Sequence, residues 1–331
     1  MTAGPTFGVE PFEVGYGASF AAQGGSPLDL DCPVVEDGGV MTVHTPPRAG
    51  IPERLAFVDG TMSTDARLTR READGSLAAG IAGAWAAGSV LSEAGLPLRL
   101  DGVCFGRLTV CCGGAPVPLP PQPGGWEWEA VAVEGDDVEV ARQRLQRRMR
   151  EAEGALAERL CDAGWLTVVD GPLNNVRRTR TVPIVGYVKT HHRRMLAADT
   201  WARVPELEVG QRSSLFAIGA DLYGAYLRVG DAGPWASAWA GIVRLEVPSG
   251  AGRAAATGAV ESAAAWLPRF ASAPHRDRRA PVNLTPISGL ERALRRHTGD
   301  PGLALRAVRA AVMQLNTRET ATTATRTGDR R

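Results

Sequence analysis

The chain has 331 residues, 44% hydrophobic and 22% charged, with a formal net charge of +1, which is ordinary for a globular protein with one large or two smaller cores. It contains no apolar run of about 18 residues, and residues 1–13 lack the basic and apolar regions of a signal peptide, so no membrane association is expected. The cysteines show no CxxC spacing, which argues against a disulfide framework or a zinc cluster and favours a cytoplasmic location; they are Cys32, Cys104, Cys111, Cys112 and Cys161.

The first part of the chain predicts an arm followed by consecutive strands. Residues 1–50 are rich in Gly and Pro, which predicts an irregular N-terminal arm. An Asp-Gly turn at 74–75 separates strand-like segments, a pattern typical of a hairpin, so three consecutive antiparallel strands are expected. These strands are drawn from the segments 54–60, 66–71 and 77–91. Residues 97–128, which contain a Pro cluster, are expected to form an insertion.

A long amphipathic helix is expected over residues 138–161. Its apolar residues recur on one stripe at helical spacing: Ala141, Leu145, Met149, Ala152, Leu156 and Leu160. Gly154 lies inside this helix at a cost of about 1 kcal/mol relative to Ala, which suggests that another segment approaches closely there. Gly164 is expected to end the segment.

The remaining elements follow in order. Strands are expected to end at Asp170 and just before Lys189, and two more are expected over 214–229 and 236–247. Helices are expected over 255–271 and 287–315, and a Thr/Arg-rich tail, 317–331, is expected to be disordered. The domain itself is expected to span 51–316.

Two short hydrophobic strands end in the same tripeptide, Val-Asp-Gly, at Asp59 and at Asp170. A carboxylate at the end of a buried strand is costly to desolvate unless it meets a cation or a hydrogen-bond donor. Each Asp-Gly alone is also a common turn dipeptide. Two of them, on separate strands of one sheet, favour a shared metal site at Asp59 and Asp170.

A third acidic ligand would come from the helix at 138–161. At about 100° per residue, Glu153 falls roughly 70° from the centre of the apolar stripe, whereas Glu151 and Glu158 point towards solvent. Glu153 is therefore the preferred metal ligand and Glu151 the reserve. The alternative is an exposed glutamate paired with a nearby arginine.

The basic residues divide into one lysine and many arginines. Lys189 is the only lysine among 37 basic residues, which suggests that its position requires a compact ammonium. It could offset charge on a phosphate or simply neutralise the carboxylates. Arginines cluster at 142–150, 177–180 and 276–279, where they could contact phosphates or form solvated helix faces.

Three strands, a helix and two further strands form the order of the RNase H-like fold, a mixed sheet flanked by helices; here an insertion and extra C-terminal elements are added. Nucleases of this architecture place one Asp on the first strand, an acid on the first helix and a second Asp after the fourth strand. These acids hold divalent ions, and Mg²⁺ and Mn²⁺ prefer such hard oxygen ligands.

Several short motifs resemble those of the NurA family of DNA-end-processing nucleases. They are Phe57-Val58-Asp59-Gly60-Thr61, Val168-Val169-Asp170-Gly171-Pro172-Leu173, Val185-Gly186-Tyr187-Val188-Lys189, Val243-Arg244-Leu245-Glu246-Val247-Pro248 and Pro281-Val282-Asn283-Leu284. The resemblance covers about residues 50 to 300.

The resemblance implies a Mn²⁺-dependent (or Mg²⁺-dependent) single-strand endonuclease and 5′-to-3′ exonuclease that acts in DNA end resection and repair. It also implies a homodimer that works with a HerA-type hexameric ATPase. Asp59, Glu153 and Asp170 would hold the metal, with Lys189 as a further catalytic residue. The residues expected to contact DNA are Arg177, Arg178, Arg180 and His191.

One position departs from the family pattern. Where the family has Ala-His, this chain has Ile287-Ser288, so a histidine that would act as metal ligand or acid-base is missing. Candidate substitutes are His275, His297, His191 and His192. Two alternatives stay open, the first because of this departure and the second because RNase H-like folds also host phosphotransferases. One is a catalytically weak dimeric adaptor that docks on an ATPase ring and guides DNA. The other, a phosphotransferase, is disfavoured because no GxxxxGK[ST] motif occurs.

Overall fold

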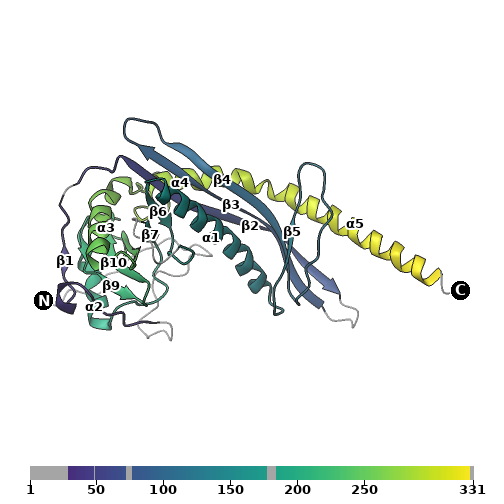
Figure 1. Ribbon diagram of the computed structural model, residues 1–331, viewed down its shortest axis with the longest axis horizontal. Helices are drawn as coiled ribbons and strands as arrows, with labels where there is room; N and C mark the ends of the chain where they lie inside the picture. The colour runs from purple at the N-terminus through teal and green to yellow at the C-terminus, as the bar shows by residue number, and fades with distance from the viewer. Residues whose placement is uncertain (1–28, 48, 72–76, 177–183, 329–331) are drawn as a thin grey trace. The chain divides into compact units, whose positions relative to one another are not determined.

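The computed structural model describes residues 29–47, 49–71, 77–176 and 184–328, with side chains as far as residue 317 (Figure 1). Within these ranges eleven strands form one mixed sheet flanked by helices, which confirms the α/β class. The strand order is β1-β8-β10-β11-β7-β6-β2-β3-β4-β5, with β9 paired to β10. No helix in the described part of the chain is long and apolar enough to cross a membrane.

The strands are β1 (Val43–His44), β2 (Arg54–Arg71), β3 (Leu77–Glu93), β4 (Arg99–Cys111), β5 (Glu129–Ala132), β6 (Leu166–Asp170), β7 (Ile184–Val188), β8 (Arg212–Ser213), β9 (Phe216–Ile218), β10 (Leu222–Arg228) and β11 (Ile242–Pro248). The α-helices are α1 (Val138–Asp162), α2 (Ala198–Arg203), α3 (Arg253–Trp266), α4 (Thr285–Thr298) and α5 (Pro301–Gly328). Short 3₁₀ turns are η1 (Asp37–Gly39), η2 (Val204–Glu206) and η3 (Leu267–Phe270).

The chain divides into two units, each described by itself. The first unit is Met1–Asp59, Ser89–Asp101 and Gly154–Leu290, and the second is Gly60–Gly88, Gly102–Glu153 and Glu291–Arg331. Elements such as β2 and α1 contribute to both units.

In the first unit, three strands run parallel at the centre. The start of β2 pairs with β6 from Leu55 opposite Leu166 to Val58 opposite Val169, and β6 pairs with β7 from Thr167 opposite Ile184. Strand β11 is antiparallel to β7, and β10 is antiparallel to β11. The carboxyl ends of β6, β7 and β10 therefore meet at one edge of the sheet, where β11 begins.

Alternation along these strands creates two buried faces in the first unit. Phe57, Val168 and Tyr187 pack under α3, η3 and the start of α4, in a core that includes Trp266 and Ile287 (Figure 1). On the opposite face, the C-terminal half of α1 packs on β2, β6 and β7; this core contains Ala56, Val58, Val169, Leu156 and Leu160. Neighbouring residues of β2 therefore point to opposite faces of the sheet.

Gly154 of α1 marks a close approach, as its place in the helix suggests. A Cβ added to Gly154 would lie 2.2 Å from the carbonyl oxygen of Asn175, well inside van der Waals contact. The loop after β6 therefore packs directly on the backbone of α1. Gly164, with φ of +81°, ends the segment.

We expect Gly154→Ala to lower the free energy of unfolding by about 2 kcal/mol, because the clash with Asn175 backbone outweighs the gain in helix propensity. The matched control is Gly258→Ala in α3, where an added Cβ meets nothing within 4 Å. That variant should gain about 0.5 to 1 kcal/mol. Urea unfolding measures the stability of both variants. A Gly154→Ala protein as stable as Gly258→Ala would contradict the close packing of Asn175 on α1.

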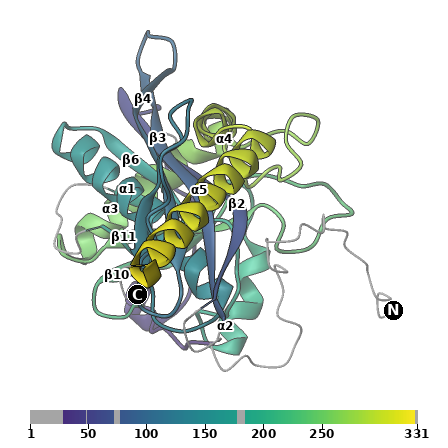
Figure 2. The ribbon, with the colours of Figure 1, turned by 90° about the vertical axis from the view of Figure 1, so that its right-hand side faces the viewer.

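The second unit has a core of its own. The N-terminal half of α1 packs on β3 and β4 through Leu145 and Met149, with Ile81, Trp85 and Leu108 on the strands. Helix α5 packs through Val308 and Ala311 on Ala82 of β3 and on a loop that contains Leu119 and Trp128 (Figure 2).

Several expected boundaries differ from the structure. The segments 54–60 and 66–71 form one strand, β2, and β4 (Arg99–Cys111) occupies much of the expected insertion. The expected strand over 214–229 is divided into β9 and β10, and residues 236–241 precede β11 as a loop. The turn at 74–75 and most of 1–50 lie outside the described residues.

The C-terminal helices also differ from expectation. The helix expected over 287–315 is two helices, α4 and α5, separated where Gly299 adopts a φ of +89° and Pro301 begins the next helix. Helix α5 continues to Gly328, through most of the tail that was expected to be disordered.

Candidate functional site

Asp59 and Asp170 lie side by side at the sheet edge of the first unit. Val58 pairs with Val169, so the next residues, Asp59 and Asp170, are adjacent on neighbouring parallel strands. A carboxylate oxygen of each lies within 4.8 Å of the other, and the two residues are only 5% and 8% exposed. The structure therefore brings together the two aspartates that the sequence motifs single out.

Lys189 follows β7 and points to this pair. Its Nζ donates hydrogen bonds to Asp170 Oδ2 at 2.5 Å and to Asn283 Oδ1 at 3.0 Å. The side chains of Lys189 and Asp170 are 8% and 10% exposed, so this is a buried ion pair. Such a pair is held in one geometry because either charge alone would be costly to bury.

Asn283 connects Lys189 to a second set of polar side chains. Its Nδ2 donates to Asp277 Oδ2 at 2.6 Å and to Ser288 Oγ at 2.8 Å, and Ser288 Oγ donates to the same Asp277 oxygen at 2.5 Å. Burial acts to raise the pKa of Asp277, but these hydrogen bonds, one from the Arg279 backbone and the Arg279 charge bring it below its ordinary value. The network fixes the amide of Asn283 and, through it, the ammonium of Lys189.

This second set of polar side chains was not predicted from the sequence. Asn283 stands in the Pro-Val-Asn-Leu segment of the family resemblance, but nothing in its spacing indicated contact with Lys189. Ser288 occupies the position where a histidine was expected, and the structure places it beside Asp277 and Asn283. Polar residues in irregular segments carry no periodic signal, so tertiary structure alone brings them together.

Tyr187 supports the segment that carries Asn283. It is fully buried, and its hydroxyl donates to the Val282 carbonyl at 2.7 Å. Desolvation by burial and, to a smaller extent, the Asp170 charge hold the pKa of Tyr187 well above its ordinary value. The phenol therefore stays neutral and acts as a support for residues 282–283.

The donor set at Asp59 and Asp170 fits a hard divalent cation. Two buried carboxylates lie close together beside the ammonium of Lys189. Carboxylate oxygens are the ligands that Mg²⁺ and Mn²⁺ prefer.

The burial of the two acids of α1 is as predicted, but the position of Glu153 relative to the strand residues is not. Glu153 is 1% exposed and Glu151 is exposed, which agrees with the helix phase. However, Glu153 lies over Gly60, where an added Cβ would meet its Oε1 at 2.6 Å, and it accepts a hydrogen bond from Arg150 at 2.9 Å. Because Gly60 and Asp59 are neighbours in a strand, they point to opposite faces of β2. The structure therefore does not group Glu153 with Asp59 and Asp170.

Helix α4 carries another acid. Ile287 is buried in the core under the sheet, and Ser288 belongs to the Asp277 network. Glu291 follows them by four and three residues, which places it on the same helix face. Its side chain is 17% exposed. One face of α4 therefore contains both Ile287, which packs under the sheet, and the carboxylate of Glu291.

The predicted DNA contacts receive little support. Arg177, Arg178 and Arg180 lie outside the described residues. His191 is 4% exposed and packs among Trp201, Tyr226 and Trp239, so it offers no surface to DNA, and that prediction is withdrawn. The other candidate histidines, His192, His275 and His297, are exposed.

Several arginines of α1 form ion pairs with glutamates of the same helix or lie over an aromatic ring of a neighbouring strand. Arg142 and Arg150 pair with Glu139 and Glu153, and Arg148 lies over the ring of Trp85. This supports the interpretation of residues 142–150 as a paired helix face. By contrast, Arg276 and Arg278 are exposed on the segment that carries Asp277.

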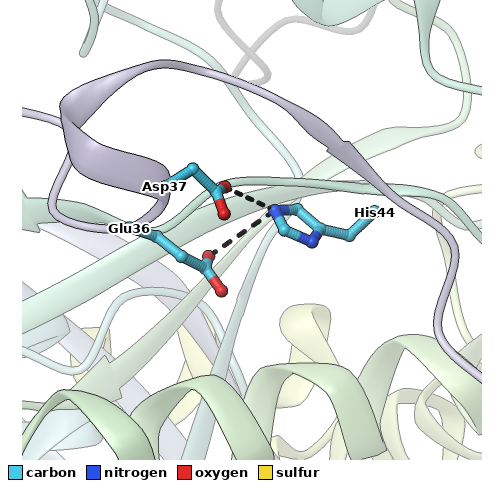
Figure 3. Close-up of side chains that lie close together, drawn as sticks. All are labelled: Glu36, Asp37 and His44. Atoms are coloured by element: carbon cyan, nitrogen blue, oxygen red, sulfur yellow. Dashed lines mark hydrogen bonds and ion pairs between the residues drawn. The ribbon is translucent and has the colours of Figure 1, made fainter.

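A second group with metal-binding residue types lies at the start of the described chain. Glu36, Asp37 and His44 converge there (Figure 3), with His44 Nε2 2.7 Å from Asp37 Oδ2. Glu36 already binds both terminal nitrogens of the buried Arg212. Hydrogen bonds, first from Ser214 and then from Thr42, lower the pKa of Asp37 to about 2. Both carboxylates are thus satisfied by protein groups, and we interpret this group as structural.

Comparisons with known proteins add no identification. No protein-family model matches the chain, and no curated protein matches it. The function must therefore be inferred from the geometry of the Asp59–Asp170 site.

Proposed function

We propose that this protein is a divalent-metal-dependent deoxyribonuclease. The observation that carries the proposal is the pair of buried carboxylates, Asp59 and Asp170, with the ammonium of Lys189 hydrogen-bonded to one of them at the same sheet edge. Asp59 and Asp170 would hold Mn²⁺ or Mg²⁺, which would activate water and stabilise the leaving oxygen of a phosphodiester when bound.

Lys189 is suited to orient the scissile phosphate. An ammonium has three donors, and Asp170 and Asn283 accept two of them. The third can reach an anionic oxygen of a substrate. Because Asn283 is itself fixed by Asp277 and Ser288, the ammonium is pre-positioned rather than mobile, which is how a preorganised charge contributes to catalysis.

The order of the elements along the chain supports an RNase H-like fold. After the short strand β1, the long strands β2, β3 and β4 are followed by the short strand β5 and by helix α1; then β6 pairs parallel to β2, and β7 pairs parallel to β6. The resemblance to NurA nucleases rests separately on the short sequence motifs and their order along the chain. A homodimer and a HerA-type ATPase partner are part of the same proposal, as is a role in DNA end resection.

Two exposed arginines lie close in sequence to residues that support Lys189. Arg276 and Arg278 flank Asp277, whose carboxylate belongs to the network that fixes Lys189. Cations at such positions can contact phosphates on either side of a scissile bond. They replace His191 among the residues that we expect to contact DNA.

The test is cleavage of 5′-labelled linear and single-stranded DNA in Mn²⁺ by the wild-type protein and by Asp59→Ala and Asp59→Asn. We expect metal-dependent cutting by the wild type, loss in both Asp59 variants, and full activity in the control Glu151→Gln, an exposed helix acid. Cutting by the Asp59 variants at the wild-type rate would contradict the proposal.

The same assay tests the predicted helical ligand. Glu153→Gln removes the acid that the helix phase of α1 selects. If the wild type does not cleave DNA, either alone or with an ATPase partner, the adaptor alternative is favoured. DNA binding that survives in Asp59→Ala would then support it.

A further inference from the structure

Trp235 is the most unusual exposed residue of the first unit. It is 79% exposed, although tryptophan is among the residues that gain most from burial. It lies in the loop 229–241, which joins the end of β10 to the start of β11. That loop is therefore at the same sheet edge as the carboxyl ends of β6 and β7.

The loop is fixed at its base. The guanidinium of Arg228 donates hydrogen bonds to the carbonyls of Ala238 and Ala240 at 2.9 and 2.6 Å, and also to those of Pro205 and Leu207. The Val229 N–H donates to the Gly241 carbonyl at 2.7 Å, which closes the loop. Trp235 is thus held out on an anchored loop, and its exposure does not come from a frayed end.

The loop packs on the segment that supports Lys189. A Cβ added to Gly230 would lie 2.6 Å from Pro281 Cβ, and one added to Gly241 would lie 3.3 Å from Pro281 Cγ. Two residues later, Asn283 accepts the hydrogen bond from Lys189. A short chain of contacts therefore joins the base of the Trp235 loop to the site.

Inside the loop, short-range hydrogen bonds set the direction of the chain before and after Trp235. Asp231 accepts from the Gly233 N–H at 2.8 Å, and the Gly233 carbonyl accepts from the Ala236 N–H at 3.2 Å. Gly233 has a φ of +88°, a conformation that favours glycine. The loop is therefore a defined turn that presents one aromatic ring.

We propose that Trp235 is a stacking platform for an unpaired nucleobase of DNA whose backbone lies at Asp59 and Asp170. The inference rests on the proposed function and names its substrate as single-stranded or frayed DNA. An exposed aromatic ring stacks on any base, and the ammonium of Lys189, at the same sheet edge, supplies a cation for the phosphate backbone. Paired bases are already stacked on each other, so duplex DNA would not use the ring.

The experiment measures binding of labelled oligothymidine in EDTA by fluorescence anisotropy, with wild type, Trp235→Ala and Trp235→Phe. Trp235→Ala should weaken binding roughly 5- to 100-fold, and Trp235→Phe should recover most of it. An abasic oligonucleotide of the same length should bind wild type and Trp235→Ala equally. The matched control Leu96→Ala, at another exposed apolar residue of this unit, should bind as the wild type does.

The outcomes distinguish this inference from the proposed function. Equal binding of oligothymidine by wild type and Trp235→Ala, or no binding by the wild type, overturns the stacking role. If the wild type also cuts DNA in Mn²⁺, the nuclease proposal survives that result. A base-dependent loss of binding in Trp235→Ala without any cutting by the wild type supports the platform and contradicts the nuclease.

Discussion

Replacing Lys189 by Met should lower the free energy of unfolding by about 3 to 5 kcal/mol at neutral pH. The change removes the ammonium from the buried ion pair with Asp170, and removal of one partner from a buried ion pair costs about this much. Met keeps most of the length of the lysine side chain, so packing loss contributes little. Urea unfolding in EDTA measures the effect.

Added Mn²⁺ should restore part of this loss. A ligand at about 100 times its dissociation constant stabilises the folded state by about 2.7 kcal/mol, and removal of the ammonium strengthens the attraction between the carboxylates and a metal. The thermal shift with Mn²⁺ should therefore be larger in Lys189→Met than in the wild type. It should disappear when Asp59→Asn and Asp170→Asn are added.

Two controls make this result specific. Arg142→Met breaks an exposed ion pair with Glu139 and should cost less than about 1 kcal/mol, with no response to Mn²⁺. Na⁺ at matched ionic strength should not replace Mn²⁺. A Lys189→Met protein as stable as the wild type in EDTA would contradict the contribution of the buried ion pair. A Lys189→Met protein that Mn²⁺ does not stabilise would show that the carboxylate pair holds no divalent ion.

The aspartate pair could be predicted because its signal is local. Each Asp ends a hydrophobic run and precedes a glycine, and parallel strands place such ends at one edge. The helix over 138–161 was equally accessible, since its stripe has a clear period. The same period predicted that Glu153 faces the sheet, and it is indeed buried.

The helical period of residues 138–161 could not predict which face of the sheet the helix covers. A helix stripe shows which residues point inward, but whether the helix covers the face that carries Asp59 depends on how the strands are connected and packed. Strand β2 was also hidden, because polar residues such as Ser63 and Asp65 interrupt its hydrophobic pattern. Asn283 and Ser288 reach the site from segments whose local sequence gives no distance information.

Lowering the pH from about 7 to 4 should remove about 3 kcal/mol of stability through His191 alone. Burial, first of all, lowers the pKa of His191 from 6.5 to about 4, and the charges of Arg244 and His192 act in the same direction. The other groups that face it are the rings of Trp201, Tyr226 and Trp239 and the carbonyl of Ile242, none of which is an acid.

The sign follows from which state binds the proton. Below pH 6.5 the unfolded chain protonates this histidine, while the folded protein keeps it neutral until about pH 4. The unfolded state therefore binds more protons in this window, stability falls as the pH falls, and a difference of this size corresponds to about 3 kcal/mol.

His191→Phe, which keeps an aromatic ring in the cluster, should flatten the dependence by nearly one proton. His192→Gln, at the exposed neighbour, should leave it unchanged. Urea unfolding at pH 7, 6, 5 and 4.5 compares the three proteins, and equal slopes for wild type and His191→Phe would mean that the imidazole is charged inside the folded protein.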